Sequence, residues 1–331
     1  MTGTGNRKLG LPSRISFPAA RGYRLRWTDV PETMRNSIEA RLGGSVTRVQ
    51  VRRDGFSPAF AGIVTDSSGG KAFLKITGPD PNPSAPDFYR REIRSMSLLP
   101  PGLPVPRLLW TQDEGGWVAL AFEPIAGRSP RLPWRTRDLE RVFTAWKDLS
   151  ERLTPAPSGF PSIAGWRDDQ FRGWRSLLAR SASPDDALVR RLDVWARGHL
   201  VELADLEAEW PGAAAGRSLL HGDLRADNIL LTKDRVFFVD WPEARVGAPW
   251  VDVLCMLPSV AMQGGPQPWE LWGRVAGTED VPSGDARAML AGIAGFFVEN
   301  ALKPPPPGLP TLREFQRVQG KQAIAWLRRM V

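Results

Sequence analysis

Three oxygen-bearing side chains lie close together in the second half of the sequence. Asp223 is in the stretch HGDLRADNIL, Asn228 follows five residues later, and Asp240 ends the apolar run RVFFVD. Carboxylate and carboxamide oxygens are hard ligands that suit Mg²⁺, and a carboxylate can also accept the proton of a hydroxyl group. We expect the three on a loop and the end of an adjoining strand. Together they provide the groups that phosphoryl transfer requires.

The elements that precede these residues form a β-rich segment. Residues 28–42 predict an amphipathic helix capped by Asp29, and residues 87–99 predict a second helix. Two strands around a DEGG turn are expected within 107–123. Three β-rich runs predict an antiparallel meander, at 46–53, 59–66 and 71–77. The order of strands, helix and strands indicates a small α+β unit.

The remainder of the chain has mainly helical periodicity. Apolar residues at helical spacing predict one helix over 139–153 and another over 188–203. A short β-hairpin is expected within 228–240. Near the C-terminus, Thr311 and Glu314 have the spacing of a capping box that opens a last helix.

Composition narrows the class of protein. Of the 331 residues, 42% are apolar and 24% are charged, which is typical of a soluble globular protein. No apolar run is long enough to cross a bilayer, and residues 1–20 lack the apolar stretch of a secretory signal. Cys255 is the single cysteine, so an intramolecular disulfide is excluded. We therefore expect a cytoplasmic protein, with this thiol buried in an apolar run.

The net charge of +8 raises the question of a nucleic-acid partner. Arginines make up most of the 44 basic residues, and they are scattered singly and in pairs among acidic residues. Such scatter is typical of a solvated surface and not of a nucleic-acid-binding patch. We expect neither a nucleic-acid partner nor a membrane partner.

The pattern HGD-x-x-x-x-N, followed by an apolar strand and VDW, resembles the signature of the aminoglycoside phosphotransferase and choline kinase family. These enzymes phosphorylate small molecules and are related to the protein kinases. The resemblance implies an α+β, protein-kinase-like, two-lobe fold, with an antiparallel sheet and a helix in the small N-terminal lobe and a larger, mainly helical C-terminal lobe. We expect a flexible tail over 1–22, a nucleotide-binding lobe over 23–126 and a helical lobe over 127–331.

The resemblance also implies roles in the catalytic loop at 221–228. Asp223 matches the family's catalytic base, which accepts the proton of the attacking hydroxyl. Asn228 and Asp240 match its Mg²⁺ ligands. Arg225 lies where protein kinases often place a lysine near the γ-phosphate. His221 is expected to be structural, with its ring bonded to the backbone.

Further positions match the part of the family that holds ATP. The turn containing Gly55 and Ser57 matches the loop that covers the phosphates, with glycine permitting close approach. Lys75 matches the lysine that neutralises the α- and β-phosphates. Glu92 lies on an otherwise apolar helical face, where a carboxylate needs a cationic partner, and Lys75 is the natural candidate.

The strand ending in AFEPIAG resembles the family's interlobe hinge. The resemblance implies that the Glu123 carbonyl and the Ile125 amide bond the adenine edge. Asp252 matches an aspartate that supports the catalytic loop. Glu243 and the pair 168–169 are the acids best placed, by analogy, to meet a substrate amine, although acids of this kind are more often solvated surface residues.

The resulting hypothesis is an ATP- and Mg²⁺-dependent phosphotransferase that moves the γ-phosphate to a hydroxyl of a small molecule, such as an antibiotic, a sugar or an amino alcohol. A catalytically silent kinase-fold module is the alternative, but Asp223, Asn228, Asp240 and Lys75 are all present, which favours the enzyme. Few acids cluster in the C-terminal third, so a neutral or weakly charged acceptor is at least as plausible as a polycationic one. We expect a monomer or a homodimer. Asp227 has no assigned role.

Overall fold

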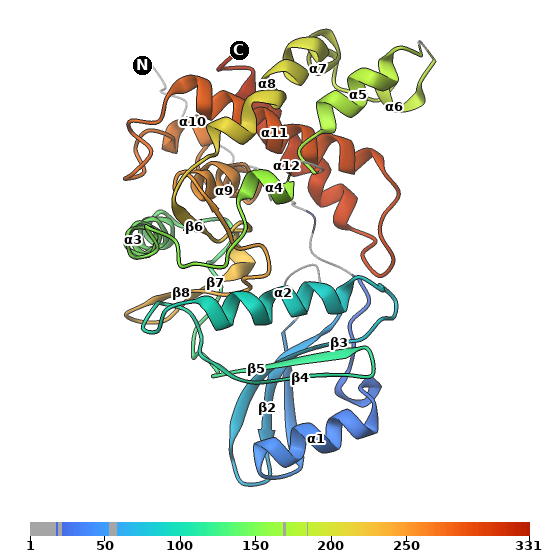
Figure 1. Cartoon of the computed structure of the whole chain (residues 1–331), viewed down its shortest axis with the longest axis vertical. Helices are drawn as coiled ribbons and strands as arrows, with labels where there is room; N and C mark the ends of the chain where they lie inside the picture. Colours follow the sequence, from blue (N-terminus) through green and yellow to red (C-terminus); the bar gives the residue numbers. More distant parts are fainter. Residues whose placement is uncertain (1–17, 19–21, 53–57, 168–169, 184) are drawn as a thin grey trace, which may run out of the picture.

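The structure is a computed structural model that describes residues 18, 22–52, 58–167, 170–183 and 185–331. Its N-terminal part is built on a five-stranded antiparallel sheet with the order β1-β2-β3-β5-β4 (Figure 1). The strands are β1 (Val46–Val51), β2 (Phe60–Asp66), β3 (Lys71–Thr77), β4 (Leu108–Glu114) and β5 (Trp117–Phe122). The predicted meander and the predicted strands around the DEGG turn are therefore confirmed.

Each face of the sheet packs against one helix. Helix α1 (Glu32–Leu42) covers one face, and α2 (Ala85–Leu98) lies on the other, between the sheet and the helical part of the chain (Figure 1). Because side chains alternate along a strand, Leu74 and Ile76 of β3 pack in the core shared with α1. Lys75, between them, projects toward α2. A charged side chain on this face needs a partner from that helix.

The start of α1 differs from the prediction. The helix begins at Glu32, and residues Trp27–Asp29 form a separate short 3-10 helix, η1. Pro31 occupies the N-cap position of α1 and breaks the predicted 28–42 helix, because the residue before a proline is disfavoured in the helical region and Val30 is extended, with a ψ of 135°. The Asp29 carboxylate accepts a hydrogen bond from the backbone N–H of Arg26 at 2.9 Å and does not cap α1.

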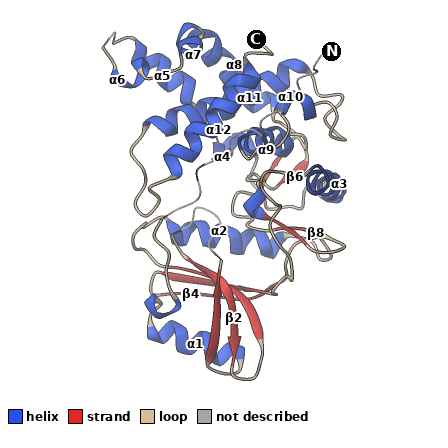
Figure 2. Cartoon of the chain, turned by 180° about the vertical axis from the view of Figure 1, so that it is seen from behind, coloured by secondary structure: helices blue, strands red, loops and turns tan. Residues whose placement is uncertain are grey.

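The C-terminal part is mainly helical and lies at the opposite end of the molecule from the sheet (Figure 2). Helix α11 packs against α12, α8, α5 and α9. The helices of this part include α3 (Thr136–Arg152), α4 (Ile163–Arg167), α5 (Gly173–Ser181), α8 (Leu200–Ala213), α9 (Val251–Met262), α10 (Pro268–Leu271), α11 (Ser283–Leu302) and α12 (Leu312–Leu327). The domain boundary placed between residues 126 and 127 stays a prediction.

Close packing around α11 depends on glycine. A Cβ atom on Gly173 at the start of α5 would lie 2.0 Å from the backbone oxygen of Gly295 in α11. The helices can therefore approach only with glycine at this crossing. Tryptophans fill the space beside it, and Trp174 and Trp210 are fully buried.

The prediction of a single helix over 188–203 is wrong. The chain forms α6 (Ala187–Arg190), α7 (Val194–Gly198) and the start of α8 in its place. The carboxylates of Asp186 and Asp193 cap α6 and α7 by accepting backbone N–H groups. These local hydrogen bonds interrupt the helix although the apolar spacing continues.

The predicted hairpin over 228–240 is present as β7 (Ile229–Leu231) and β8 (Val236–Phe238). The capping box expected before α12 does not form, because the Thr311 side chain makes no capping hydrogen bond and Glu314 pairs with Arg317. Cys255 in α9 is half-buried and not fully buried as expected. None of the helices described has the length and apolarity needed to span a membrane.

Candidate active site

The HGD turn follows β6 (Ser218–Leu220), which pairs with β9 (Arg245–Gly247). The Asp252 carboxylate, from the first turn of α9, accepts the backbone N–H groups of His221 at 2.8 Å and Gly222 at 2.9 Å. Gly222 has a φ of +79°, and a Cβ atom there would lie 2.2 Å from the Glu243 backbone oxygen. Glycine is therefore required, and Asp252 supports the loop as expected.

His221 is a buried scaffold residue. Its Nε2 lies 2.9 Å from the Val239 carbonyl oxygen, and its Nδ1 accepts the backbone N–H of Asp223 at 3.3 Å. Both contacts are satisfied by the neutral tautomer with the proton on Nε2, which donates to Val239. Burial lowers the pKa of His221, which favours that neutral form. The ring packs on Trp241 with centroids 4.7 Å apart, so the two halves of the site are joined.

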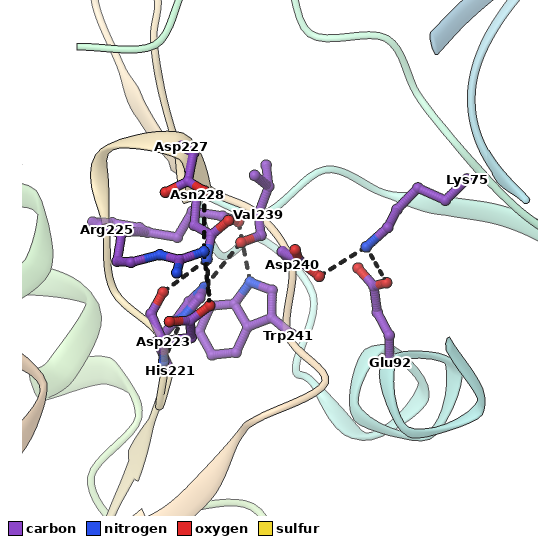
Figure 3. A network of polar contacts seen from close by, with 11 residues as sticks. Lys75, Glu92, His221, Asp223, Arg225, Asp227, Asn228, Val239, Asp240 and Trp241 are labelled. Atoms are coloured by element: carbon purple, nitrogen blue, oxygen red, sulfur yellow. Dashed lines mark hydrogen bonds and ion pairs between the residues drawn. The ribbon is translucent and has the colours of Figure 1, made fainter. Parts of the chain in front are cut away.

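Asp223 and Asn228 face each other across the loop (Figure 3). The Asn228 Nδ2 group donates to the Asp223 backbone oxygen at 2.8 Å and to its carboxylate at 3.1 Å. The enclosed position raises the pKa of Asp223 to about 7, although the Arg225 guanidinium acts in the opposite direction. A pKa close to neutral is suited to a group that accepts and releases a proton.

Arg225 lies between two carboxylates of the same loop. Its Nη2 atom is 3.3 Å from Asp223 and 3.0 Å from Asp227, and its guanidinium lies over the Phe315 ring of α12 at 5.7 Å. This geometry gives Asp227 the structural role that sequence reasoning missed, which is to orient Arg225. The two-residue spacing of opposite charges was the available signal.

Lys75 joins the sheet, α2 and the end of the β7–β8 hairpin (Figure 3). Its ammonium pairs with Glu92 of α2 and lies 2.8 Å from the Asp240 carboxylate. Burial alone would lower the pKa of Lys75, but the charges of Asp240 and Glu92 outweigh it and raise that pKa above its usual range. The predicted Lys75–Glu92 pair is present, and Lys75 also contacts Asp240, which had been considered separately.

The backbone at Asp240 is unusual. Asp240 has a φ of +72°, the only positive φ among described residues other than glycine. Such conformations are strained and persist where surrounding contacts hold them. Here the side chain is held by Lys75, and the next residue, Trp241, donates its indole N–H to the Phe238 oxygen at 3.1 Å. With this backbone conformation the Asp240 carboxylate lines the cleft and contacts Lys75.

A cavity of about 330 Å³ lies between the sheet and the helical part. The cavity is lined by Lys75, Glu92, Asp223, Arg225, Asn228 and Asp240, and also by Glu123 and Ile125. No described residue bonds the Glu123 carbonyl or the Ile125 amide, so both are available to a ligand edge. Gly55, Ser57 and the acids at 168–169 lie outside the described residues.

A second cavity, of about 250 Å³, opens on the other side of Asp223. Residues of α2, α4, α9, α11, α12 and the loop itself line it. Phe88, Asp223, Arg225 and Leu312 line both cavities. The two spaces therefore meet at Asp223 and Arg225.

The donor set in the first cavity suits a magnesium ion. Asn228 and Asp240 offer an amide oxygen and a carboxylate to the same space, and Mg²⁺ commonly takes one or two carboxylates together with substrate phosphates. In the part of the chain that the structure describes, no group of three or more His, Cys, Asp or Glu side chains is placed to hold a metal alone. A metal here would need oxygen ligands from a bound phosphate.

Solved structures of low sequence identity share this fold. An aminoglycoside phosphotransferase APH(4)-Ia, solved with ADP and hygromycin B, has a TM-score of 0.58 at 14% identity, over 89% of this chain and 98% of that one. Macrolide 2'-phosphotransferase type I scores 0.55 at 18% identity, over 92% and 98%. A choline/ethanolamine kinase family protein from Mesorhizobium loti scores 0.54 at 16%, over 90% and 94%. The predicted α+β, protein-kinase-like fold is thereby confirmed.

The sequence comparison is more specific than the fold. Residues 48–289 match the model of the phosphotransferase enzyme family, which spans most of the sheet, the catalytic loop and α9. The chain belongs to this family, as the HGD and VDW motifs predicted. No curated protein matches the chain in a sequence search.

The Asp252→Asn substitution is expected to loosen the HGD turn. An amide can offer only one oxygen to the two backbone N–H groups of His221 and Gly222, and its NH₂ group would face the other. We expect a loss of about 1–3 kcal/mol in the free energy of unfolding. Urea denaturation measures it, with Asp234→Asn on the exposed β7–β8 turn as control. Equal stability of the two variants would show that Asp252 does not hold the turn.

Proposed function

We propose that the protein transfers the γ-phosphate of ATP to a hydroxyl group of a small molecule, in a reaction that requires Mg²⁺. The observation that carries this proposal is the meeting of two cavities at Asp223 and Arg225. A phosphotransferase must hold the acceptor hydroxyl in line with the γ-phosphate, with a base beside that hydroxyl and a cation near the transferred group. Family membership supports the same reaction class.

The nucleotide is proposed to occupy the cavity beneath the sheet. The unbonded Glu123 carbonyl and Ile125 amide would hold the adenine edge, and Lys75 would meet the α- and β-phosphates. Glu92 keeps the Lys75 ammonium oriented toward the cleft. The loop with Gly55 and Ser57 is proposed to cover the phosphates.

Asn228 and Asp240 are the residues proposed to hold magnesium. When bound, the ion would offset phosphate charge and orient the phosphates. Asp240 is already held as a carboxylate, because the Lys75 charge lowers its pKa against the effect of burial. Asn228 is fixed by its two hydrogen bonds to Asp223. Both side chains are therefore pre-positioned.

In the transfer step the acceptor oxygen forms a bond to the γ-phosphorus while the bond to the β,γ-bridging oxygen breaks, and ADP leaves. Asp223 orients the acceptor hydroxyl and takes its proton, so no phosphorylated enzyme forms. Arg225 lies 3.3 Å from Asp223 and is placed to stabilise negative charge on the moving group. Asp227 keeps Arg225 in that position.

The Asp240→Ala variant is expected to bind AMP-PNP with an affinity at least about tenfold weaker in the presence of Mg²⁺, because a charge-assisted ligand is lost. Isothermal titration calorimetry with and without EDTA measures the effect. The Asp234→Ala variant, altered at an exposed turn, should behave like the wild type. Absence of Mg²⁺-dependent AMP-PNP binding by the wild type would contradict the proposed function.

The Asp223→Asn variant separates binding from chemistry. We expect AMP-PNP affinity close to that of the wild type and a kcat lower by about 10²–10⁴-fold, because the amide cannot accept the hydroxyl proton. ADP release, measured against a panel of sugars, amino alcohols and antibiotics, provides the rate. Nucleotide binding without turnover of any acceptor would favour the catalytically silent module, and equal rates in both proteins would exclude Asp223 as the base.

A further inference from the structure

The cavity beyond Asp223, here called the acceptor cavity, is largely apolar. Five phenylalanines line it: Phe88, Phe171, Phe296, Phe297 and Phe315. Met289 and Ile293 of α11 extend the same surface. The volume of the acceptor cavity is about 250 Å³. At about 30 Å³ for each water-sized atom, this space holds on the order of ten non-hydrogen atoms of a ligand. Such walls favour a compact apolar group.

The charged residues around the acceptor cavity already have partners in the protein. Glu243 is almost completely buried and pairs with Arg91 at 3.5 Å. Asp252 accepts two backbone N–H groups of the HGD turn. Arg225 is held by Asp223 and Asp227. A ligand with several ammonium groups would therefore bury charge without a dedicated carboxylate for each.

Gln319 of α12 is the exception among the polar groups. Its side chain is only 3% exposed and it lines the acceptor cavity. Within the described ranges no residue forms a hydrogen bond with its amide, whereas the neighbouring Gln316 accepts one from Arg313. An amide that lines a cavity without a protein partner can be satisfied there by a ligand or by water. Its oxygen and NH₂ group can bond a neutral hydroxyl, ether or carbonyl.

We infer that the acceptor is an uncharged hydroxyl compound with an apolar, aromatic-sized body, and that Gln319 selects it by hydrogen-bonding a neutral polar group. This inference rests on the proposed phosphoryl transfer and adds the substrate class. The acceptor loses its hydroxyl proton to Asp223 and gains the γ-phosphate, as in the step above. Among the described residues the acids that line the acceptor cavity are already paired, which disfavours a polycationic aminoglycoside relative to such an acceptor.

The experiment first measures whether the nucleotide binds and then compares acceptors. AMP-PNP and Mg²⁺ binding is measured by calorimetry, and failure there rejects the proposed function itself. With nucleotide bound, phenyl β-D-glucoside and 4-nitrophenyl glycosides are compared with kanamycin and hygromycin B by calorimetry and by ADP release with ATP. We expect the aryl glycosides to have a kcat/KM at least about 100-fold above that of the aminoglycosides.

Variants of α12 test the residue assigned. Gln319→Leu is expected to raise the KM for the aryl glycosides by about 10- to 100-fold, with kcat and AMP-PNP affinity nearly unchanged. Gln322→Leu, on the same helix but outside the cavity lining, should have no effect. If nucleotide binds but the aryl glycosides neither bind nor react, or if the aminoglycosides react better, the inference is overturned while the proposed function stands. An unchanged KM in Gln319→Leu would remove Gln319 from substrate selection.

Discussion

The rest of the site depends on the ion pairs that the buried Lys75 ammonium makes with two carboxylates. It pairs with Glu92 of α2 and with Asp240 after β8, so one charge connects the sheet, its covering helix and the helical part. An isolated ammonium at this depth would be strongly unfavourable, and the Glu92 carboxylate, with 2% of its side chain exposed, would be unfavourable without it. The two ion pairs of Lys75 therefore hold the sheet, α2 and the end of the hairpin together around the cleft.

The catalytic loop follows from a second constraint, which is the satisfaction of backbone groups. Asp252 accepts the N–H groups of His221 and Gly222, and the neutral His221 ring bonds the Val239 carbonyl. These contacts fix the backbone on either side of the cleft. Asp223 is thereby held where the two cavities meet. In the proposed function, nucleotide binding on one side and acceptor recognition on the other would then depend on different parts of the chain.

Residues close in sequence were the most predictable part of the site. The HGD-x-x-x-x-N spacing located Asp223 and Asn228, and the isolated carboxylate on an apolar helical face pointed to the Glu92–Lys75 pair. Long-range packing was not accessible in the same way. Gln319 lies in a helix far along the chain, and only the fold brings its amide to the acceptor cavity.

The errors in secondary structure were also local in origin. Apolar spacing predicted one helix over 188–203, but Asp186 and Asp193 cap separate short helices there. Asp29 had the spacing of a cap, yet Pro31 sets the start of α1. In each case a capping side chain or a proline ring set where the helix begins. The spacing of apolar residues indicates which residues are buried, but it does not show whether a helix is continuous.

The nucleotide phosphates are proposed to bind at the Lys75 ammonium, and this can be tested directly. Calorimetric titration of Mg²⁺ and AMP-PNP into Lys75→Met and Lys71→Met tests it, because Lys71 is an exposed lysine on the same strand. We expect Lys75→Met to lose about tenfold to 100-fold in affinity, the effect of one charge-assisted contact, while Lys71→Met binds like the wild type. Equal affinities in a folded Lys75→Met protein and the wild type would contradict the account.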